Sequence, residues 1–125
     1  MSHGTIHWTE LNTRDAEGAK AFYSKTMGWT YDSMPMDGGG TYWLAKNKDE
    51  MVAGIFDISS GEMGDIPNCW MTYVAVDDID KRAKMAKDNG ATILQEPFDV
   101  PGVGRIAMIM QPDGAAVGWM TPSND

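Results

Sequence analysis

The chain has 125 residues, the length of a single domain. Its 18 acidic and 10 basic side chains give a net charge of -8. A protein with this charge lacks the broad electrostatic attraction to nucleic acid and to anionic membranes on which non-specific binding depends. The sequence has no apolar run of the ~18 residues that span a bilayer, no pattern of a signal peptide, and one cysteine, Cys69. We therefore expect a cytoplasmic protein with neither nucleic acid nor membrane as a partner.

The first half of the chain predicts one β-α-β-β-β module from its apolar spacing. The expected elements are strands at 5–12, 29–36, 41–46 and 51–58 and a helix at 16–27. Either Thr13 or Asp15 would cap the start of this helix, and Gly28 would end it. Its expected buried stripe consists of Ala19, Phe22, Tyr23 and Met27.

The same order restarts after a polar segment at 59–67, which we interpret as a linker. The second module is expected to have strands at 68–76, 91–98, 105–111 and 115–120 and a helix at 77–89. Asp77 or Asp78 would cap this helix, and its inward residues would be Ile79, Ala83 and Ala86. A nearly constant offset relates the two halves, which favours internal duplication over coincidence between two ordinary α+β segments.

The sequence has 11 Met and 5 Trp, which provide many of the large apolar side chains that aliphatic residues supply in most domains. Few of the usual aliphatic residues and a high net charge are together typical of disorder. Here, however, the large side chains fall in patterned segments. Because Met fills irregular gaps and also lines adaptable surfaces, a Met-rich core and a Met-lined pocket both stay open.

Several short motifs recur in a fixed order along about 5–120. They lie at 8–11, 15–23, 27–29, 73–80, 101–105 and 112–115. In order and spacing the chain resembles the vicinal oxygen chelate superfamily, which includes glyoxalase I, bleomycin-resistance proteins and extradiol dioxygenases. Within it, the motifs are most similar to glyoxalase-like modules of a mycobacterial antigen. A fold shared with these proteins does not by itself fix the chemistry.

The resemblance implies an α+β fold of two tandem βαβββ modules that form a curved mixed-sheet cup with the helices on its convex side. Residues 1–125 would be one glyoxalase-like domain, with modules at about 4–58 and 68–121. Chains of two modules in this superfamily commonly form homodimers, so the resemblance also implies a homodimer.

The metal enzymes of the superfamily place four ligands on the concave face, in the first and last strand of each module. Transferred to this sequence, these positions fall on Trp8, Gly54, Met71 and Gly118. None supplies the imidazole nitrogen or carboxylate oxygen that a divalent metal needs, and only His7 lies beside them. We expect no metal and no other cofactor, so metal-dependent lyase or dioxygenase chemistry ranks last.

The most informative candidate is Glu10, which shares a strand face with Trp8 because side chains alternate along a strand. Burial in a partly apolar cup raises the pKa of a carboxylate and would suit it for general acid–base catalysis. At the rim of the cup, the same carboxylate would simply be solvated. Both interpretations stay open.

Other candidates follow from equivalence between the modules. Met71 and Tyr73 correspond to Trp8 and Glu10, and Met120 shares a face with Gly118. Either Trp43 or its neighbour Tyr42 would face the cup, and we select Trp43. Arg105, next to a Gly-x-Gly turn, would bind an anion or belong to a flexible entry loop.

Two functions stay open. In the first, the cup binds a small apolar or aromatic molecule through Trp8, Glu10, Trp43, Met71, Tyr73, Arg105 and Met120. In the second, a metal-independent enzyme uses Glu10 to move a proton. The space left by Gly54 and Gly118 would admit a flat ligand or be filled by Trp8 and Met71.

Overall fold

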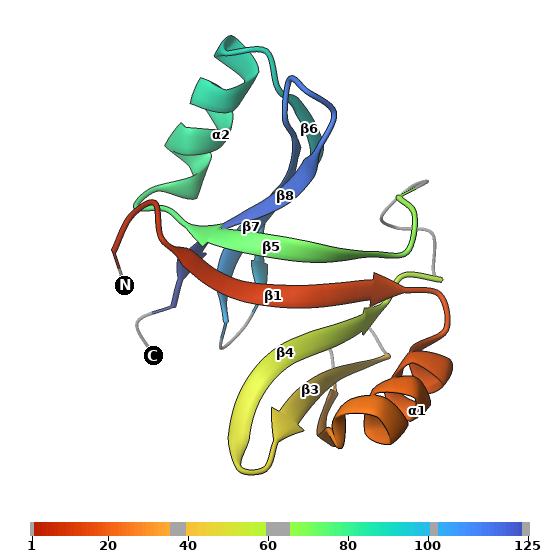
Figure 1. Ribbon diagram of the computed structural model, residues 1–125. Helices are drawn as coiled ribbons and strands as arrows, with labels where there is room; N and C mark the ends of the chain where they lie inside the picture. The colour runs from red at the N-terminus through yellow and green to blue at the C-terminus, as the bar shows by residue number, and fades with distance from the viewer. Residues whose placement is uncertain (1, 36–39, 60–65, 101–102, 124–125) are drawn as a thin grey trace. The chain divides into compact units, whose positions relative to one another are not determined.

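The structure, a computed structural model, describes residues 2–35, 40–59, 66–100 and 103–123 (Figure 1). The chain divides into two compact units. The middle unit comprises Thr9–Trp70, and the terminal unit comprises Met71–Asp125 together with Met1–Trp8. Most of the expected linker at 59–67 lies outside the described residues. So does most of the Asp-Gly-Gly-Gly segment at 37–40, whose composition predicts a turn between the strands on either side.

The middle unit is a four-stranded mixed sheet with one helix. Its elements are β1 (Ile6–Thr13, mostly in this unit), α1 (Ala16–Met27), β2 (Thr30–Pro35), β3 (Thr41–Asn47) and β4 (Glu50–Asp57). The strands lie in the order β2-β3-β4-β1, where β1 and β4 are parallel and the other neighbours are antiparallel.

The terminal unit repeats this arrangement. Its elements are β5 (Cys69–Ala75), α2 (Ile79–Asp88), β6 (Thr92–Val100), β7 (Gly104–Met110) and β8 (Ala116–Pro122). The order β5-β8-β7-β6 again has one parallel pair, β5 with β8. The predicted α+β class and the β-α-β-β-β modules are confirmed, and every predicted element is present within about two residues. No helix in the described ranges is long and apolar enough to span a membrane.

The strand register supports the duplication. In the middle unit, Gly54 lies opposite Glu10 on one side and Leu44 on the other. In the terminal unit, Gly118 lies in the same way between Tyr73 and Met108. The last strand of each module therefore carries a glycine at an equivalent point of the sheet.

Both helices begin at an aspartate, which settles the two alternatives left by the sequence. The Asp15 carboxylate accepts a hydrogen bond from Gly18 N at 2.9 Å, and the Asp78 carboxylate accepts one from Lys81 N at 3.2 Å. Gly28 ends α1 in the left-handed conformation, with φ of 75°, which costs glycine little. These caps satisfy backbone groups that a helix end leaves without a partner.

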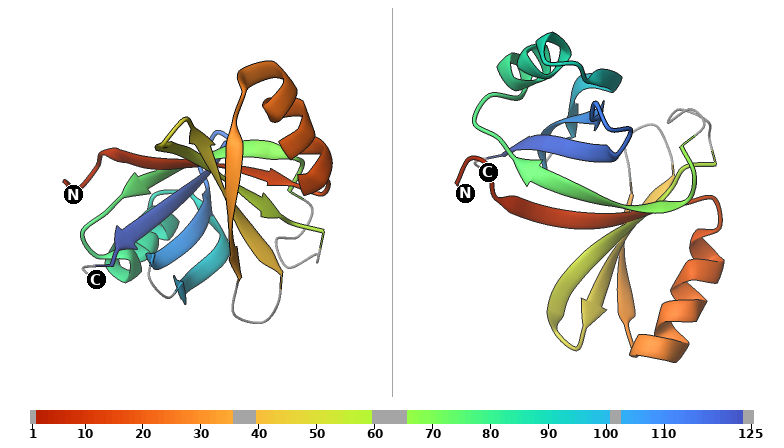
Figure 2. Two further views of the ribbon diagram at one scale, coloured as in Figure 1. Left: turned by 90° about the horizontal axis from the view of Figure 1, so that it is seen from below. Right: turned by 45° about the horizontal axis from the view of Figure 1, so that its top comes forward.

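Helix α2 packs onto its own sheet as predicted. It lies against β6, β7 and β8 (Figure 2). Ile79, Ala83 and Ala86 are all buried. The core cluster on this side of the sheet contains Val76, Ile79, Ala86, Ala107, Ile109 and Val117.

The predicted stripe of α1 is partly wrong. Phe22 and Met27 are 57% and 58% exposed. The helix instead turns Lys20 towards the sheet: its Nζ lies 3.0 Å from the centre of the Trp43 ring, and its carbonyl accepts a hydrogen bond from Tyr31 Oη. The long aliphatic stem of a lysine can occupy an inward position while its charge stacks on an aromatic ring.

Aromatic rings gather beside α1 in the middle unit. Tyr23 and Trp29 stack with ring centres 4.7 Å apart, and Trp70 packs edge-on against both. Trp70 Nε1 also donates a hydrogen bond to Tyr23 Oη at 3.2 Å. These contacts hold the end of α1, the start of β2 and the start of β5 together.

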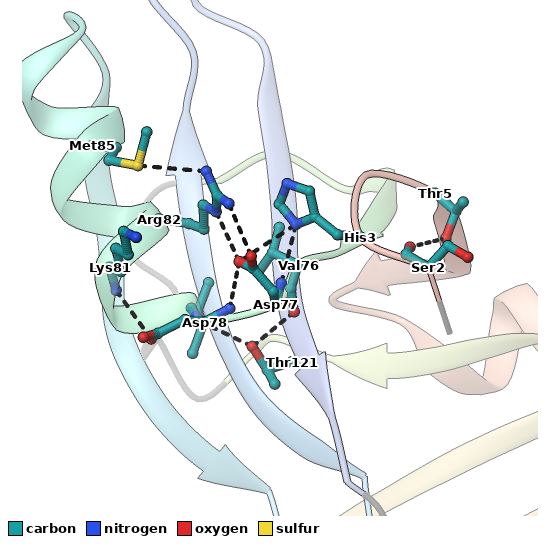
Figure 3. Close-up of polar contacts among 11 residues, drawn as sticks. Ser2, His3, Thr5, Val76, Asp77, Asp78, Lys81, Arg82, Met85 and Thr121 are labelled. Carbon is teal, nitrogen blue, oxygen red and sulfur yellow. Dashed lines mark hydrogen bonds and ion pairs between the residues drawn. The ribbon is translucent and has the colours of Figure 1, made fainter.

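Thr121 ties β8 to the start of α2 (Figure 3). Its Oγ1 accepts a hydrogen bond from Ile79 N and donates one to Val76 O, both at 3.0 Å. We expect Thr121→Val to keep the shape, break both bonds and lower the free energy of unfolding by about 1–3 kcal/mol in urea titrations.

Thr26→Val is the matched control, because the Thr26 hydroxyl bonds within an exposed turn of α1 where water can replace it. Its effect should stay within about 0.5 kcal/mol. Equal losses in the two variants would contradict the role assigned to Thr121.

Candidate functional site

In the middle unit, α1 covers one face of the sheet and leaves a chemically different face on the other side. The Trp43 ring lies under Lys20 of α1, so strand alternation directs its neighbour Tyr42 to the opposite face. The register adds the remaining members of this face. We call it the α1-distal face: Glu10, Asn12, Tyr42, Leu44, Gly54 and Phe56.

A carboxylate and a phenol lie close together on the α1-distal face. Glu10 is 6% exposed and is the cross-strand partner of Gly54. A Cβ added to Gly54 would overlap the hydroxyl end of Tyr42, so this hydroxyl sits directly over the glycine. The Glu10 side chain and the Tyr42 hydroxyl therefore lie on the same face of the sheet, beside Gly54.

The terminal unit has an apolar counterpart, which we call the α2-distal face: Met71, Tyr73, Ala75, Met108, Gly118 and Met120. Met71, Tyr73 and Met120 are all 3% exposed or less. The Tyr73 ring lies over Gly118, and its hydroxyl is 3.9 Å from Met108 Sδ. This face offers packing surface and no charged group among these members.

Tyrosine rings fill the space beside both glycines. The sequence left open whether a flat ligand or the side chains of Trp8 and Met71 would occupy this space. The side chains nearest to it are Tyr42 at Gly54 and Tyr73 at Gly118. In the middle unit the tyrosine comes from β3, whereas in the terminal unit it comes from β5. In both modules a tyrosine ring packs against the equivalent glycine, but the tyrosine comes from a different strand in each.

The positions that correspond to metal ligands do not fit a metal ion. Two of them are Trp8 and Met71, and the space in front of Gly54 and Gly118 is taken by rings. Among the described residues, no three His, Cys, Asp or Glu side chains are grouped to hold a metal. His7 alone, beside Trp8, cannot make up a ligand set.

Two predicted site residues lie on helix-covered faces. Trp43 lies on the face of the sheet that α1 covers, whereas Glu10 lies on the other face. Arg105 donates to both Asp80 oxygens, at 2.8 and 3.0 Å, and to Asp99 at 3.3 Å. These bonds raise the pKa of Arg105 above its usual range and lower that of Asp80. The anion-binding loop suggested for Arg105 also includes Gly102, which lies outside the described residues.

An ionic cluster fixes the N-terminal segment at the start of α2 (Figure 3). Arg82 donates to both oxygens of Asp77, at 2.8 and 2.9 Å, and Asp77 N donates to His3 Nδ1 at 3.1 Å. The Arg82 guanidinium holds the pKa of the Asp77 carboxyl well below its usual range. The sequence analysis missed this cluster, because no spacing rule links residue 3 to residue 77.

Comparison with known proteins assigns the family. The model of the Glyoxalase/Bleomycin resistance protein/Dioxygenase superfamily matches residues 5–118. The chain belongs to this superfamily. This match confirms the resemblance inferred from the motifs, and it agrees with the strand order and the two β-α-β-β-β units of the fold.

Curated relatives include CFP32 of Mycobacterium tuberculosis, which its name describes only provisionally as a glyoxylase. It is 40% identical over 116 residues, covering 92% of this chain and 44% of CFP32. The anthracycline biosynthesis protein DnrV of Streptomyces peucetius is 29% identical over 125 residues, covering 90% of this chain and 45% of DnrV. The chain thus spans less than half the length of these relatives.

Solved structures share the fold across nearly the full chain. A hypothetical protein of Bacillus halodurans has a TM-score of 0.69 at 10% identity, covering 99% of this chain and 98% of that one. Methylmalonyl-CoA epimerase of Streptomyces coelicolor has a TM-score of 0.65 at 15% identity, covering 98% and 99%. At these identities the similarity concerns the fold alone.

The contact between Tyr73 and Gly118 yields a stability prediction. Gly118 does not adopt a left-handed φ, so Gly118→Ala strains no backbone, but its Cβ would overlap the buried Tyr73 ring. We expect a loss of about 1–3 kcal/mol in the free energy of unfolding. Combined with Tyr73→Leu, the loss should be smaller than the sum of the two single effects. Full additivity would contradict the contact.

The Asp77–Arg82 pair yields a pH prediction. Because the pKa of Asp77 is lower in the folded protein, its contribution is complete above the ordinary Asp value of about 4 and is lost as the pH falls below it. Arg82→Gln should therefore destabilise the protein near neutral pH, and the difference from wild type should shrink in acid. Urea midpoints measured from pH 2 to pH 7 test this, and a difference independent of pH would refute it.

Proposed function

We propose that the chain binds a small apolar or aromatic molecule without a metal ion, and that Glu10 on the α1-distal face recognises a polar group of that molecule. The observation that carries the proposal is the buried Glu10 carboxylate opposite Gly54, with the Tyr42 hydroxyl over the glycine. A carboxylate and a phenol on one sheet face can together hold a ligand group that donates and accepts hydrogen bonds.

The charge of Glu10 favours a ligand with a cationic or N–H group. A ligand group of this kind forms charge-assisted hydrogen bonds with a carboxylate, and these are stronger than hydrogen bonds between neutral groups. The net charge of -8 also raises the local concentration of cations over that of anions. Trp8, two residues before Glu10 on β1, supplies apolar contact. Met71, Tyr73 and Met120 form an apolar surface within the terminal unit.

Trp43 and Arg105 have no part in this proposal, because Lys20 and two aspartates already engage them. The relatives named for anthracycline biosynthesis support a small-molecule ligand without identifying it here. We also propose that the protein acts in the cytoplasm as a homodimer, as the single cysteine and the superfamily suggest.

A second candidate function rests on the same pair of side chains. A carboxylate that removes a proton and a phenol that stabilises developing negative charge form a metal-independent acid–base pair. In this candidate Glu10 is the base and Tyr42 the hydrogen-bond donor. Binding and catalysis then differ in what happens to the ligand after it is bound.

The test is a thermal-shift screen of a metabolite library, repeated with EDTA. A compound that binds the folded state raises the melting temperature by mass action. We expect a bound compound to remain bound in EDTA. Glu10→Gln should weaken its affinity about tenfold or more, because a buried charged contact is worth over 1.4 kcal/mol.

Glu50→Gln is the control, since Glu50 is an exposed carboxylate at the start of β4. It should leave the affinity unchanged. Glu10→Gln abolishing turnover while leaving affinity intact would replace the binding function with the acid–base function. Loss of binding in EDTA, or equal affinity in the Glu10 variant without any turnover, would refute both.

A further inference from the structure

A hollow of about 480 Å³ lies on the α2 side of the terminal unit, on the face opposite Tyr73 and Met120. It is bounded by the N-terminal segment, by α2 and by the side of β5 and β8 that faces α2. Its lining consists of His3, Gly4, Val74, Val76, Arg82, Met85, Ala86, Asn89 and Trp119. This volume falls within the range of small-molecule sites.

The floor of the hollow is apolar and well supported. Val74 and Trp119 are cross-strand partners in the parallel pair β5–β8, so their side chains lie next to each other. Both are partly buried and pack against the core cluster beneath α2. A flat ring can therefore stack on an indole that the core already holds in place.

One wall of the hollow is the N-terminal segment. Hydrogen bonds to the end of β5 and to Asp77, just before α2, hold this segment in position. Gly4 N donates to Ala75 O at 2.7 Å. Asp77 N donates to His3 Nδ1 at 3.1 Å (Figure 3). Because Nδ1 accepts a backbone hydrogen bond, the neutral imidazole carries its proton on Nε2. His3 thus offers one hydrogen-bond donor at the edge of the hollow.

The other wall is α2. Arg82 is held by Asp77 and also donates to Met85 Sδ at 3.5 Å, while Asn89 Nδ2 donates to Met85 O at 2.7 Å. Met85 is 42% exposed, and its flexible thioether can adapt to the shape of a bound ring. This wall is anchored at both ends and adjustable in the middle.

The charges around the hollow select a neutral occupant. A cation would face the Arg82 guanidinium, which stands at the rim. An anion would gain little from Arg82, because both oxygens of Asp77 already bind that guanidinium and the protein carries a net charge of -8. A hydrogen-bond acceptor without net charge matches the donor on His3 and adds no charge repulsion.

We propose that this hollow is a second ligand site, separate from the α1-distal face, and that it takes a neutral, flat aromatic molecule of one or two rings with a carbonyl-type acceptor. The ring stacks on Trp119 and Val74, and the acceptor lies at the His3 edge. The site does not depend on Glu10 or on the function proposed for it.

The test uses coumarin, a neutral bicyclic lactone, added to the full ¹⁵N-labelled chain and followed by NMR. We expect saturable shifts at the amides of Val74, Val76 and Ala86 and at the indole N–H of Trp119. Coumarin-3-carboxylate, an anion, and protonated tetrahydroisoquinoline, a cation, should each bind at least about tenfold more weakly, a difference of 1.4 kcal/mol.

Met85→Glu is the diagnostic variant, since it places a carboxylate on the rim at an exposed position that folding tolerates. Met51→Glu is its control, because Met51 is 55% exposed on β4 of the middle unit. Coumarin affinity should fall about tenfold or more in the Met85 variant and stay unchanged in the Met51 and Glu10→Gln variants.

Three results would overturn the inference. They are the absence of saturable shifts at millimolar coumarin, equal binding of a charged analogue, and equal affinity in the Met85 and Met51 variants. Shifts confined to Glu10, Tyr42 and Gly54 would also overturn it, while supporting ligand binding at the α1-distal face. The two proposals can therefore fail independently.

Discussion

A tyrosine ring packed directly on a strand glycine is the constraint that organises both sheets. Gly54 and Gly118 have no side chain, so the rings of Tyr42 and Tyr73 can approach the backbone where a Cβ would block them. Interiors are packed to the density of crystals, and a ring that fills such a gap keeps its many dispersion contacts. The rest of each sheet face is arranged around that contact.

The same contact separates this chain from the metal enzymes of its superfamily. A carboxylate in place of either glycine would need the volume that a ring now occupies, so metal ligation and the present packing are alternatives at one position. The polar side chains that remain on the α1-distal face are those of Glu10, Asn12 and Tyr42.

Much of the fold could be predicted from local pattern. Asp15, Gly28 and Asp78 mark helix ends through chemistry that acts within one turn, and the strand segments alternate clearly. The inward side of α1 could not be predicted in this way. The sequence gives no sign that Lys20 would stack on Trp43, a contact between a helix and a strand distant in the chain.

The candidate site was only partly predictable, for the same reason. Alternation places Glu10 and Trp8 on one face but does not say which of Tyr42 and Trp43 joins them. The choice depends on how β3 pairs with β4 and on what α1 covers, and both are tertiary facts. The hollow beside α2 needs residues 3, 74, 82 and 119 to meet, and no motif connects them.

The ring cluster beside α1 gives the middle unit an optical signal of its own. Tyr23, Trp29 and Trp70 lie within 6.4 Å of one another in the middle unit, close enough for their electronic transitions to couple and produce paired bands in circular dichroism. Trp119 belongs to the terminal unit and lies outside this cluster. The paired bands therefore report on the middle unit, and a melting curve of these bands that diverges from one followed by far-ultraviolet dichroism would show that the modules melt one after the other.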